Sequence, residues 1–476
     1  MSPPVDQVQS DPKLPEAADV VVIGGGIAGV SAAWHLAGKG HSVALIEKGV
    51  IAGEQSSRNW GWCRQQNRDE RELPLIKYSL ELWGRLSEEI GADVSFRRTG
   101  LIYTTDKQSD LDEWEEWSNL AREYQVHSRM LTAEEANALT PGCTKTWIGG
   151  VHSPTDGRAE PSKAAPALAE AARRRGVTIH QGCAARGLET QGGRVSAVVT
   201  EKGTIRTQAV LLAGGAWSSM FCRSLGIDLP QAGARSTAFS TTEAPEVTAG
   251  GLSTPGFVIR RRLDGGYTVS IRGRGLVELT PQGLRYARKF WPAFQKRRAG
   301  GVKISIGRSF LEGPEALGRW STDKPTPFER MRVFDPAPDI GTVDEALKQL
   351  VEAYPALAGI RMKNAWGGWI DFMPDAVPVI SPVEKLPGLT LSTGYSGHGF
   401  GIGPGAGRLA ADLVAGDAPI VDPTPFRYKR LIDGSPCRQD SCDGGGRLNR
   451  GSGGEAAPRP RGSAGRGVLP VSRARR

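Results

Sequence analysis

The chain has 476 residues of ordinary globular composition, which predicts about two or three domains. The first seventeen residues are polar and rich in proline, so we expect no signal peptide. No window approaches the roughly 18 unbroken apolar residues of a membrane span, so we expect no transmembrane helix. We therefore expect a cytoplasmic protein. Six cysteines without metal-ligand spacing predict reduced thiols, no disulfide framework and no metal site.

The first elements form a strand-helix-strand unit. The sequence DVVVIGGGIAG at residues 19–29 sets a β-branched run directly against a cluster of glycines. We expect a buried parallel strand over 19–23, a helix over 27–37 and a second strand over 42–46. This order is typical of a doubly wound fold.

The glycines of this unit predict a dinucleotide site. Gly24, Gly26 and Gly29 fit the spacing G-x-G-x-x-G, in which the first permits a tight turn, the second lets the backbone approach a pyrophosphate and the third lets helix and strand pack closely. Glu47 ends the second strand, where a carboxylate accepts hydrogen bonds from a ribose diol. The motif alone is also typical of an ordinary strand-to-helix turn, but the complete order favours a dinucleotide.

Farther along the chain the predicted elements are mixed. We expect helices over 73–90, 109–124 and 161–175, a helix start at Thr132, and strands over 177–180, 195–200 and 204–212. Short alternating segments from 231 to 307 predict an antiparallel sheet. A last strand over 389–394 and a glycine-rich turn lead to a helix over 405–414. The fold class is therefore α/β, with a doubly wound domain interleaved with an antiparallel one.

Three glycine-rich segments far apart in the chain could all contact one long ligand. They are GGGIAG at 24–29, AGGAWS at 213–218 and GYSGHGFGIGPGAG at 394–407. Over about residues 17–430 the chain resembles the D-amino acid oxidase type of flavoprotein, which includes glycine oxidase and sarcosine oxidase. Within that group it is most similar to bacterial L-amino acid deaminases, through IAGEQS at 51–56, AARGLET at 184–190, AGGAWS, and VDPTPF at 421–426.

The resemblance implies FAD as the cofactor, in a domain of glutathione-reductase-like type formed by residues 17–62, 150–230 and 365–430. Residues 63–149 and 231–364 would form the substrate domain and connecting helices. Sarcosine oxidases attach FAD through a cysteine in the segment that corresponds to 366–379; that segment has none here, so we expect non-covalent FAD. The residues implied to hold it are Gly24, Gly26, Gly29, Glu47, Gln55, Ser56, Ser57, Ala185, Gly214, Gly215, Trp217, Gly397, Gly399 and Phe400.

Three residues are implied at the substrate. Arg260 matches the position of the carboxylate-binding arginine of the deaminases, although an exposed basic strand is the alternative for this run of three arginines. Trp366 aligns with an aromatic residue beside the substrate; Trp369 is a second candidate, and both also suit a core. His398, in Ser-Gly-His-Gly, is expected either to hydrogen-bond or tune the flavin or to pack structurally.

The segment RNWGWCRQQNRDERE at 58–72 departs from the deaminases. Trp60, Trp62, Arg64 and Gln66 alternate, and such side chains could line a pocket for a polar substrate. An acidic or N-substituted amino acid, such as an opine, would suit them, whereas an amphipathic helix start with a salt-bridged face is the alternative.

The resemblance implies oxidation of a carbon–nitrogen bond by hydride transfer to flavin, giving an imine that hydrolyses to a 2-oxo acid and an amine or ammonia. Oxygen, a quinone reached by peripheral docking at the inner membrane, or a partner subunit could accept the electrons. The alternatives are an FAD-binding subunit inactive alone, a flavin dehydrogenase of a hydroxy acid or polyamine derivative, and a flavoprotein that acts on nucleic acid.

The last segment, 433–476, carries nine arginines against four acidic residues, and therefore supplies five of the nine net positive charges. It has no aromatic residue to stack on bases and no amphipathic period. We therefore expect a disordered basic tail and no nucleic-acid partner.

Overall fold

The computed structural model describes residues 2–298 and 303–435 of the chain. Most of the predicted basic tail, from residue 436 onward, lies outside the described residues. No helix in the described ranges combines the length and apolar character needed to cross a membrane.

The glycine turn belongs to a six-stranded sheet with the strand order β20-β21-β12-β1-β2-β8. All neighbouring pairs are parallel except β20 with β21, which is antiparallel. The predicted parallel strands are confirmed, although the run expected over 204–212 divides into two strands of different sheets. The strands of the six-stranded sheet are β1 (Val20–Ile23), β2 (Val43–Ile46), β8 (Thr178–His180), β12 (Ala209–Leu212), β20 (Val379–Pro382) and β21 (Leu389–Thr393).

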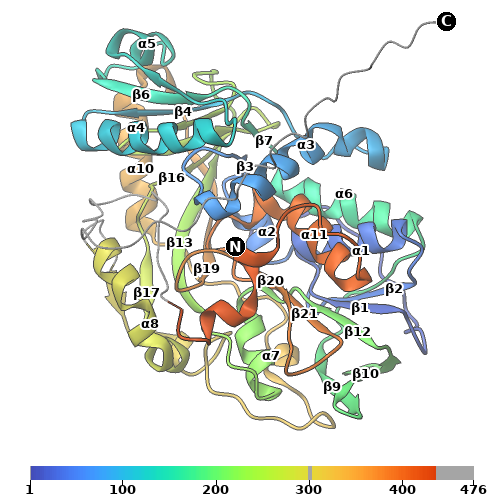
Figure 1. Ribbon diagram of the computed structural model, residues 1–476. Helices are drawn as coiled ribbons and strands as arrows, with labels where there is room; N and C mark the ends of the chain where they lie inside the picture. The colour runs from blue at the N-terminus through green and yellow to red at the C-terminus, as the bar shows by residue number, and fades with distance from the viewer. Residues whose placement is uncertain (1, 299–302, 436–476) are drawn as a thin grey trace, which may run out of the picture. The chain divides into compact units, whose positions relative to one another are not determined.

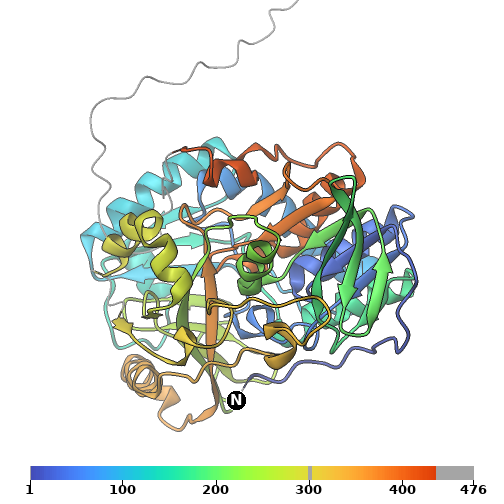
Figure 2. The ribbon, with the colours of Figure 1, turned by 90° about the horizontal axis from the view of Figure 1, so that it is seen from below.

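Strand β1 is apolar throughout because both of its faces are covered. Val20 and Val22 pack into a core with helices α1 (Ile27–Gly38) and α11 (Gly399–Ala415), whereas Val21 and Ile23 pack into a second core on the opposite face. Figure 1 shows α1, α6 (Pro161–Arg174) and α11 together on one side of this sheet. On the other side lie α7 (Ser218–Ser224) and the three-stranded sheet of β9 (Ala185–Gln191), β10 (Arg194–Thr200) and β11 (Gly203–Arg206), green in Figure 2.

A ten-stranded, mostly antiparallel sheet forms the other main part of the described chain. Its two longest strands, β13 (Ala232–Thr241) and β19 (Met362–Phe372), pair with each other over most of their length. The predicted antiparallel region is thus confirmed, with two parallel pairs, β4–β14 and β17–β18, as exceptions. The strands are β4 (Leu101–Thr105), β5 (Arg129–Leu131), β6 (Gly149–Ser153), β13 (Ala232–Thr241), β14 (Gly251–Ser253), β15 (Val258–Arg261), β16 (Tyr267–Ser270), β17 (Leu276–Glu278), β18 (Lys303–Ser305) and β19 (Met362–Phe372).

The remaining elements surround these sheets. A two-stranded sheet pairs β3 (Trp62–Cys63) with β7 (Gly157–Arg158). Thr132 caps α5 through the predicted capping box with Glu135. The other helices are α2 (Gln55–Arg58), α3 (Leu73–Ile90), α4 (Gln108–Glu123), α5 (Ala133–Ala138), α8 (Pro281–Arg298), α9 (Pro327–Arg330) and α10 (Ile340–Ala353).

Two predictions of local structure were wrong. Helix α8 lies within the segment expected to hold only short strands, because its apolar residues recur at helical spacing around an internal proline. Helix α11 begins at Gly399 and not at residue 405. Its glycines serve close packing: a Cβ on Gly403 would lie 2.7 Å from Ile27 Cγ2, and one on Gly407 would lie 2.4 Å from Ser31 Cβ, both in α1.

The predicted domain boundaries stay a prediction. The six-stranded sheet draws its strands from residues 20–46, 178–212 and 379–393, whereas the ten-stranded sheet uses 101–153 and 232–372. The chain therefore passes between the two sheets several times, as an interleaved arrangement requires.

Candidate functional site

The three glycines of the motif differ in how much space surrounds their Cα atoms. Gly24 has φ of +115°, and a Cβ there would lie 2.3 Å from the carbonyl oxygen of Ala213. A Cβ on Gly29 would lie 2.1 Å from the carbonyl oxygen of Gly24, whereas one on Gly26 would meet only Ser56 Oγ, at 3.1 Å. The first and third glycines are thus required by packing, and the second leaves space beside the N-terminus of α1.

A cavity of about 120 Å³ opens beside this turn. The carboxylate of Glu47 lies in its wall and is fixed by two backbone amides, since Gly25 N–H donates to Oε2 and Gly49 N–H donates to Oε1, each at 2.7 Å. Of the residues that the sequence predicted for the cofactor, those lining this cavity are Gly24, Gly26, Glu47, Gln55, Ser56, Ala185, Gly214, Gly215 and Trp217.

Three charged residues that line this cavity, Lys48, Glu54 and Arg332, were not predicted from the sequence. The Glu54 carboxylate accepts hydrogen bonds from Trp217 Nε1 at 3.1 Å and Lys48 Nζ at 2.7 Å. Lys48 Nζ also lies 4.3 Å from the centroid of the Trp217 ring. The signal for Glu54 was its place in the IAGEQS motif, directly before Gln55.

A larger cavity of about 560 Å³ continues from the first. Both cavities are lined by Gly26, Gln55, Ser56, Ala213 and Gly215, so one elongated ligand could extend through the two. Ser56 Oγ accepts the N–H of Ile27 at 2.9 Å and thereby holds α2 against the first turn of α1. Ser57 lines neither cavity; it is buried, and its hydroxyl donates to the carbonyl of Glu54 at 3.1 Å.

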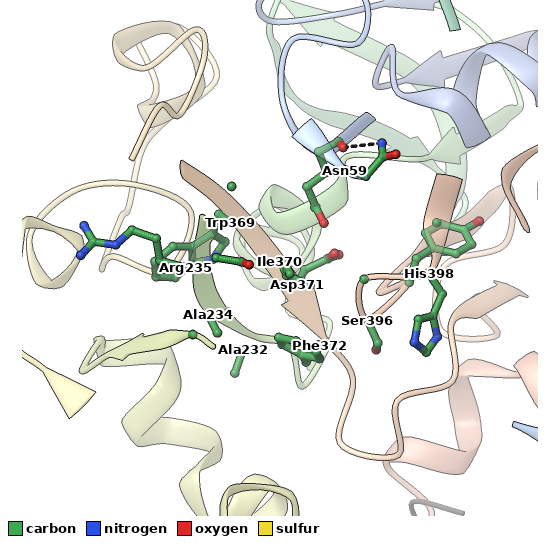
Figure 3. Close-up of a pocket in the computed structure, with 18 of the residues that line it drawn as sticks. Asn59, Ala232, Ala234, Arg235, Trp369, Ile370, Asp371, Phe372, Ser396 and His398 are labelled. Atoms are coloured by element: carbon green, nitrogen blue, oxygen red, sulfur yellow. Dashed lines mark hydrogen bonds between the residues drawn. The ribbon is translucent and has the colours of Figure 1, made fainter. Parts of the chain in front are cut away.

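The N-terminus of α11 reaches the larger cavity. His398 occupies the N-cap position, and Gly397, His398, Gly399 and Phe400 all line the wall. The partial positive charge of a helix N-terminus favours an anionic group at this place. In Figure 3, Arg235 and His398 lie at opposite sides of the view, with Trp369, Ile370 and Asp371 of β19 between them.

Arg260 and Trp366 line neither cavity. The guanidinium of Arg260 is 1% exposed and forms an ion pair with Glu160 at 2.8 Å and a hydrogen bond to Thr268 Oγ1 at 3.0 Å. Trp366 is buried and donates from Nε1 to the carbonyl of Arg58 at 2.9 Å. Trp369, the second aromatic candidate, does line the larger cavity.

The aromatic and basic segment after α2 reaches the cavity through three of its four alternating side chains. Trp60, Trp62 and Arg64 line it. Gln66 is fully buried elsewhere, where its side-chain oxygen accepts hydrogen bonds from the hydroxyls of Ser128 and Ser153, both at 2.6 Å. The rings of Trp60 and Trp62 meet edge-to-face with centroids 5.3 Å apart, which gives this wall a rigid aromatic surface.

Guanidinium groups dominate the charge of the larger cavity. Arg272, two residues after the end of β16, lies with its guanidinium carbon 5.8 Å from the centroid of the Tyr103 ring. No hydrogen bond or ion pair joins Arg272 to another residue in the part of the chain that the structure describes. Among the described residues, six arginines line the cavity against two acids: Arg58, Arg64, Arg68, Arg235, Arg272 and Arg274, with Glu278 and Asp371.

Several of these arginines already have acidic partners. Arg235 lies 3.5 Å from Glu278, and Arg274 forms an ion pair at 2.8 Å with Glu345 of α10. The sequence predicted a substrate arginine in the run 260–262 and did not predict Arg272 or Arg274, although both closely follow β16. Which arginine faces a cavity depends on pairing across the sheet, which the local sequence does not specify.

Asp371 contributes a buried carboxyl group to the same wall. It accepts hydrogen bonds from Gln231 Nε2 at 2.7 Å and from the N–H of Gly394 at 3.2 Å. Burial raises the pKa of Asp371 to about 6, which is close to neutrality. Within the described ranges, no group of three or more His, Cys, Asp or Glu side chains could hold a metal ion.

Residues 19–413 match the family of FAD dependent oxidoreductases known as DAO. The chain belongs to this family. The linked cavities, the tight glycine turn and the amides at the N-terminus of α1 fit a dinucleotide with a pyrophosphate at Gly26. FAD is therefore the cofactor of this enzyme, as the sequence predicted.

Relatives of this enzyme include the sarcosine oxidase subunit beta of Arthrobacter sp, which is 26% identical over 437 residues covering 89% of this chain and 94% of the relative. The glycine oxidase of Pseudomonas aeruginosa is 28% identical over 421 residues, 86% of this chain and 97% of the relative. Among solved structures, L-amino acid deaminase from Proteus vulgaris is 32% identical and superposes with a TM-score of 0.84, covering 89% of this chain and all of that one. These similarities confirm the predicted family resemblance, fold class and oxidoreductase chemistry.

Proposed function

We propose that this FAD-dependent amino acid oxidoreductase oxidises the carbon–nitrogen bond of an amino acid that carries a second acidic group, N-substituted as in an opine. The observation that carries the proposal is the excess of arginine over acidic side chains in the cavity that continues from the glycine turn. One carboxylate needs one guanidinium fork, so further arginines suit a further anionic group. The names of the relatives support an amino acid or N-methyl amino acid as the parent substrate.

Arg272 is the proposed anchor of the α-carboxylate. Its guanidinium has no acidic partner in the described chain, whereas those of Arg235 and Arg274 already contact Glu278 and Glu345. A planar guanidinium binds both oxygens of a carboxylate and thereby fixes the orientation of the α-carbon. The guanidinium of Arg260 already pairs with the carboxylate of Glu160, so Arg260 is better suited to a structural role.

The aromatic side chains would position the rest of the substrate. Trp60, Trp62 and Trp369 form apolar walls from different elements, which exclude water and limit the orientations of the bound amine. Arg64 and Arg68, from the segment after β3, are the proposed contacts for the second acidic group.

When bound, FAD supplies the acceptor for the hydride that leaves the α-carbon. The nitrogen lone pair then forms the carbon–nitrogen double bond of an imine, and water hydrolyses it to a 2-oxo acid and an amine or ammonia. The amine must be neutral for this step; Asp371, with a pKa of about 6, provides a carboxylate in the wall that could take the proton near neutral pH. We propose non-covalent binding of FAD, since the segment 366–379 lacks cysteine.

A second candidate is the FAD-binding subunit of a larger dehydrogenase that is inactive alone. The relative from Arthrobacter is named as a subunit, which supports a larger assembly for this chain. Opine catabolism in the cytoplasm is the proposed setting in either case.

Anaerobic mixing of the purified FAD-loaded enzyme with substrate panels tests the proposal. We expect opines or acidic amino acids to bleach the flavin absorbance, while neutral amino acids such as alanine bleach it at least tenfold more slowly. Faster bleaching by neutral amino acids would contradict the proposed substrate class. If no compound bleaches a flavin that dithionite still reduces, the partner-dependent subunit becomes the better assignment. Where a substrate does bleach the flavin, readmission of oxygen separates an oxidase, whose flavin is rapidly reoxidised, from a dehydrogenase.

A further inference from the structure

Glu72 is a fully buried carboxylate behind the wall of the larger cavity. It has 0% exposed surface and stands directly before α3, at the end of the short 3-10 helix η1 (Glu70–Glu72). Neither of its oxygens accepts a hydrogen bond from the described part of the chain. Its Oε2 lies 3.4 Å from Nδ1 of His398.

A carboxylate in such a place is costly unless a positive charge faces it. Transfer of an ionised carboxylate out of water is unfavourable by several kcal/mol even after relaxation of the protein, and pairing with a cation is the usual compensation. Glu72 is also the N-cap residue of α3, but its side chain makes no hydrogen bond to the amides of that helix. Capping of α3 therefore does not explain why a carboxylate is buried at this position.

His398 connects Glu72 with the cavity. The imidazole is 5% exposed, lines the larger cavity and occupies the N-cap of α11, where Gly399 and Phe400 continue the wall. An imidazole has two nitrogens on opposite sides of the ring, so a group bound at Nδ1 fixes the protonation and orientation of the whole ring. The contact with Nδ1 of His398 thus links Glu72 to the wall of the cavity.

Neighbouring charges have other partners. Arg71 lies 2.8 Å from Asp69 and 3.3 Å from Asp375. Burial raises the pKa of Tyr395, and the negative charges of Asp371 and Glu72 raise it further, so this phenol is neutral beside Glu72. Its hydroxyl hydrogen-bonds with Ser392 at 2.6 Å. His398 is consequently the charge partner that the geometry gives to Glu72.

We propose that Glu72 is a positioning residue that holds His398 as an imidazolium, so that this cation and the N-terminus of α11 together stabilise negative charge on the bound cofactor. The inference rests on the proposed function only in placing the redox-active end of FAD in the larger cavity. A cation at this wall raises the reduction potential of the cofactor, because reduction adds negative charge to it. Glu72 does not need to contact substrate or cofactor for this effect.

The test is Glu72→Gln in the FAD-loaded full chain, because glutamine keeps the shape of the side chain and removes its charge. We expect sulfite, which binds oxidised flavin and leaves negative charge on it, to bind roughly tenfold more weakly, which equals about 1.4 kcal/mol. The reduction potential, measured by equilibration with a reference dye, should shift to lower values. His398→Asn should reproduce both changes, and the double variant should add little to either.

Glu88→Gln is the matched control, since Glu88 is exposed on the same helix α3. Unchanged sulfite affinity and potential in a folded, FAD-loaded Glu72→Gln enzyme would overturn the proposal. If that variant loses FAD, the double variant with His398→Asn replaces it in the test, because removal of both partners leaves no isolated charge. Weak sulfite binding by a double variant that retains FAD supports the proposal. Wild-type sulfite affinity in the double variant overturns it. Neither readout needs a substrate, so a failed substrate panel would affect the proposed function alone.

Discussion

The guanidinium of Arg260 and the carboxylate of Glu160 form an ion pair with N–O distances of 2.8 and 3.1 Å, and both side chains are buried. Glu160 precedes α6, and it also accepts the N–H of Leu263 at 2.9 Å. The pair therefore ties the start of α6, which packs beside the six-stranded sheet, to β15 and to the turn after it. The attraction of Arg260 also lowers the pKa of Glu160 despite the opposing effect of burial, so this carboxylate stays charged.

We expect Arg260→Met to lower the free energy of unfolding by about 3–5 kcal/mol, because it leaves Glu160 charged, buried and without its partner. The substrate KM of the protein that folds should stay within about twofold of the wild-type value. Denaturant unfolding followed by fluorescence measures the first quantity. Arg262→Met, at an outer arginine of the same run, should cost less than 1 kcal/mol. A large rise in KM without loss of stability would restore Arg260 to the substrate site.

Arg272→Met should lower kcat/KM by about 10- to 100-fold, because a hydrogen bond to a charged group contributes about 1.5–3 kcal/mol. The loss should appear mainly in KM, since the arginine binds the carboxylate before and during the reaction. Steady-state kinetics with the best substrate of the panel measures it. The free energy of unfolding should change little, because Arg272 contacts the Tyr103 ring and no acidic partner in the described chain is left alone. Equal losses of activity in Arg272→Met and Arg262→Met would argue against this anchor.

Gly24→Ala should yield a protein that retains little FAD. The added Cβ would lie 2.3 Å from the Ala213 carbonyl oxygen, at the junction of the two cavities. Gly40→Ala is a close control, since Gly40 also has a positive φ, +90°, but nothing lies within 4 Å of its added Cβ. Both substitutions carry the cost of about 1 kcal/mol for a positive φ, so the difference in FAD retention between the two variants reports the contact of the added Cβ with Ala213. The ratio of flavin to protein absorbance after gel filtration measures retention; equal retention in the two variants would count against the cofactor turn.

Asp371→Asn should change how stability depends on pH. Burial raises the pKa of Asp371 from 3.8 to about 6, so the folded state holds a proton that the unfolded chain releases above about pH 4. The stabilisation from this proton is complete below pH 4 and declines until about pH 6, by at most about 3 kcal/mol. The variant lacks this decline.

Urea unfolding at pH 4.5, 5.5 and 7 measures the effect as the difference between wild type and variant at each pH. The free energy of unfolding of the wild type should fall relative to that of Asp371→Asn as the pH rises through this window. Asp344→Asn, at an exposed carboxylate of α10, should run parallel to the wild type. A constant difference between wild type and Asp371→Asn would mean that the folded and unfolded states bind this proton equally.

The sequence by itself determined the cofactor-binding part of this protein. Four β-branched residues, a tight glycine turn and an acidic residue at the end of the next strand lie within thirty residues of one another, so local geometry largely specifies their arrangement. The predicted order of parallel strands and helices was confirmed for the same reason, since a fully buried strand must be apolar throughout. Most of the residues expected at the cofactor accordingly line the two linked cavities.

The substrate side was decided only by the tertiary structure. In the run 260–262, strand alternation separates neighbouring arginines, but it cannot tell which side faces the cavity; pairing of β15 with β14 and β16 turns Arg260 toward Glu160, a hundred residues earlier in the chain. Arg272 and Glu72 carry no local signal, because their surroundings come from distant segments. A cavity is formed by long-range packing, and side-chain chemistry alone does not reveal which charged group the fold leaves facing it.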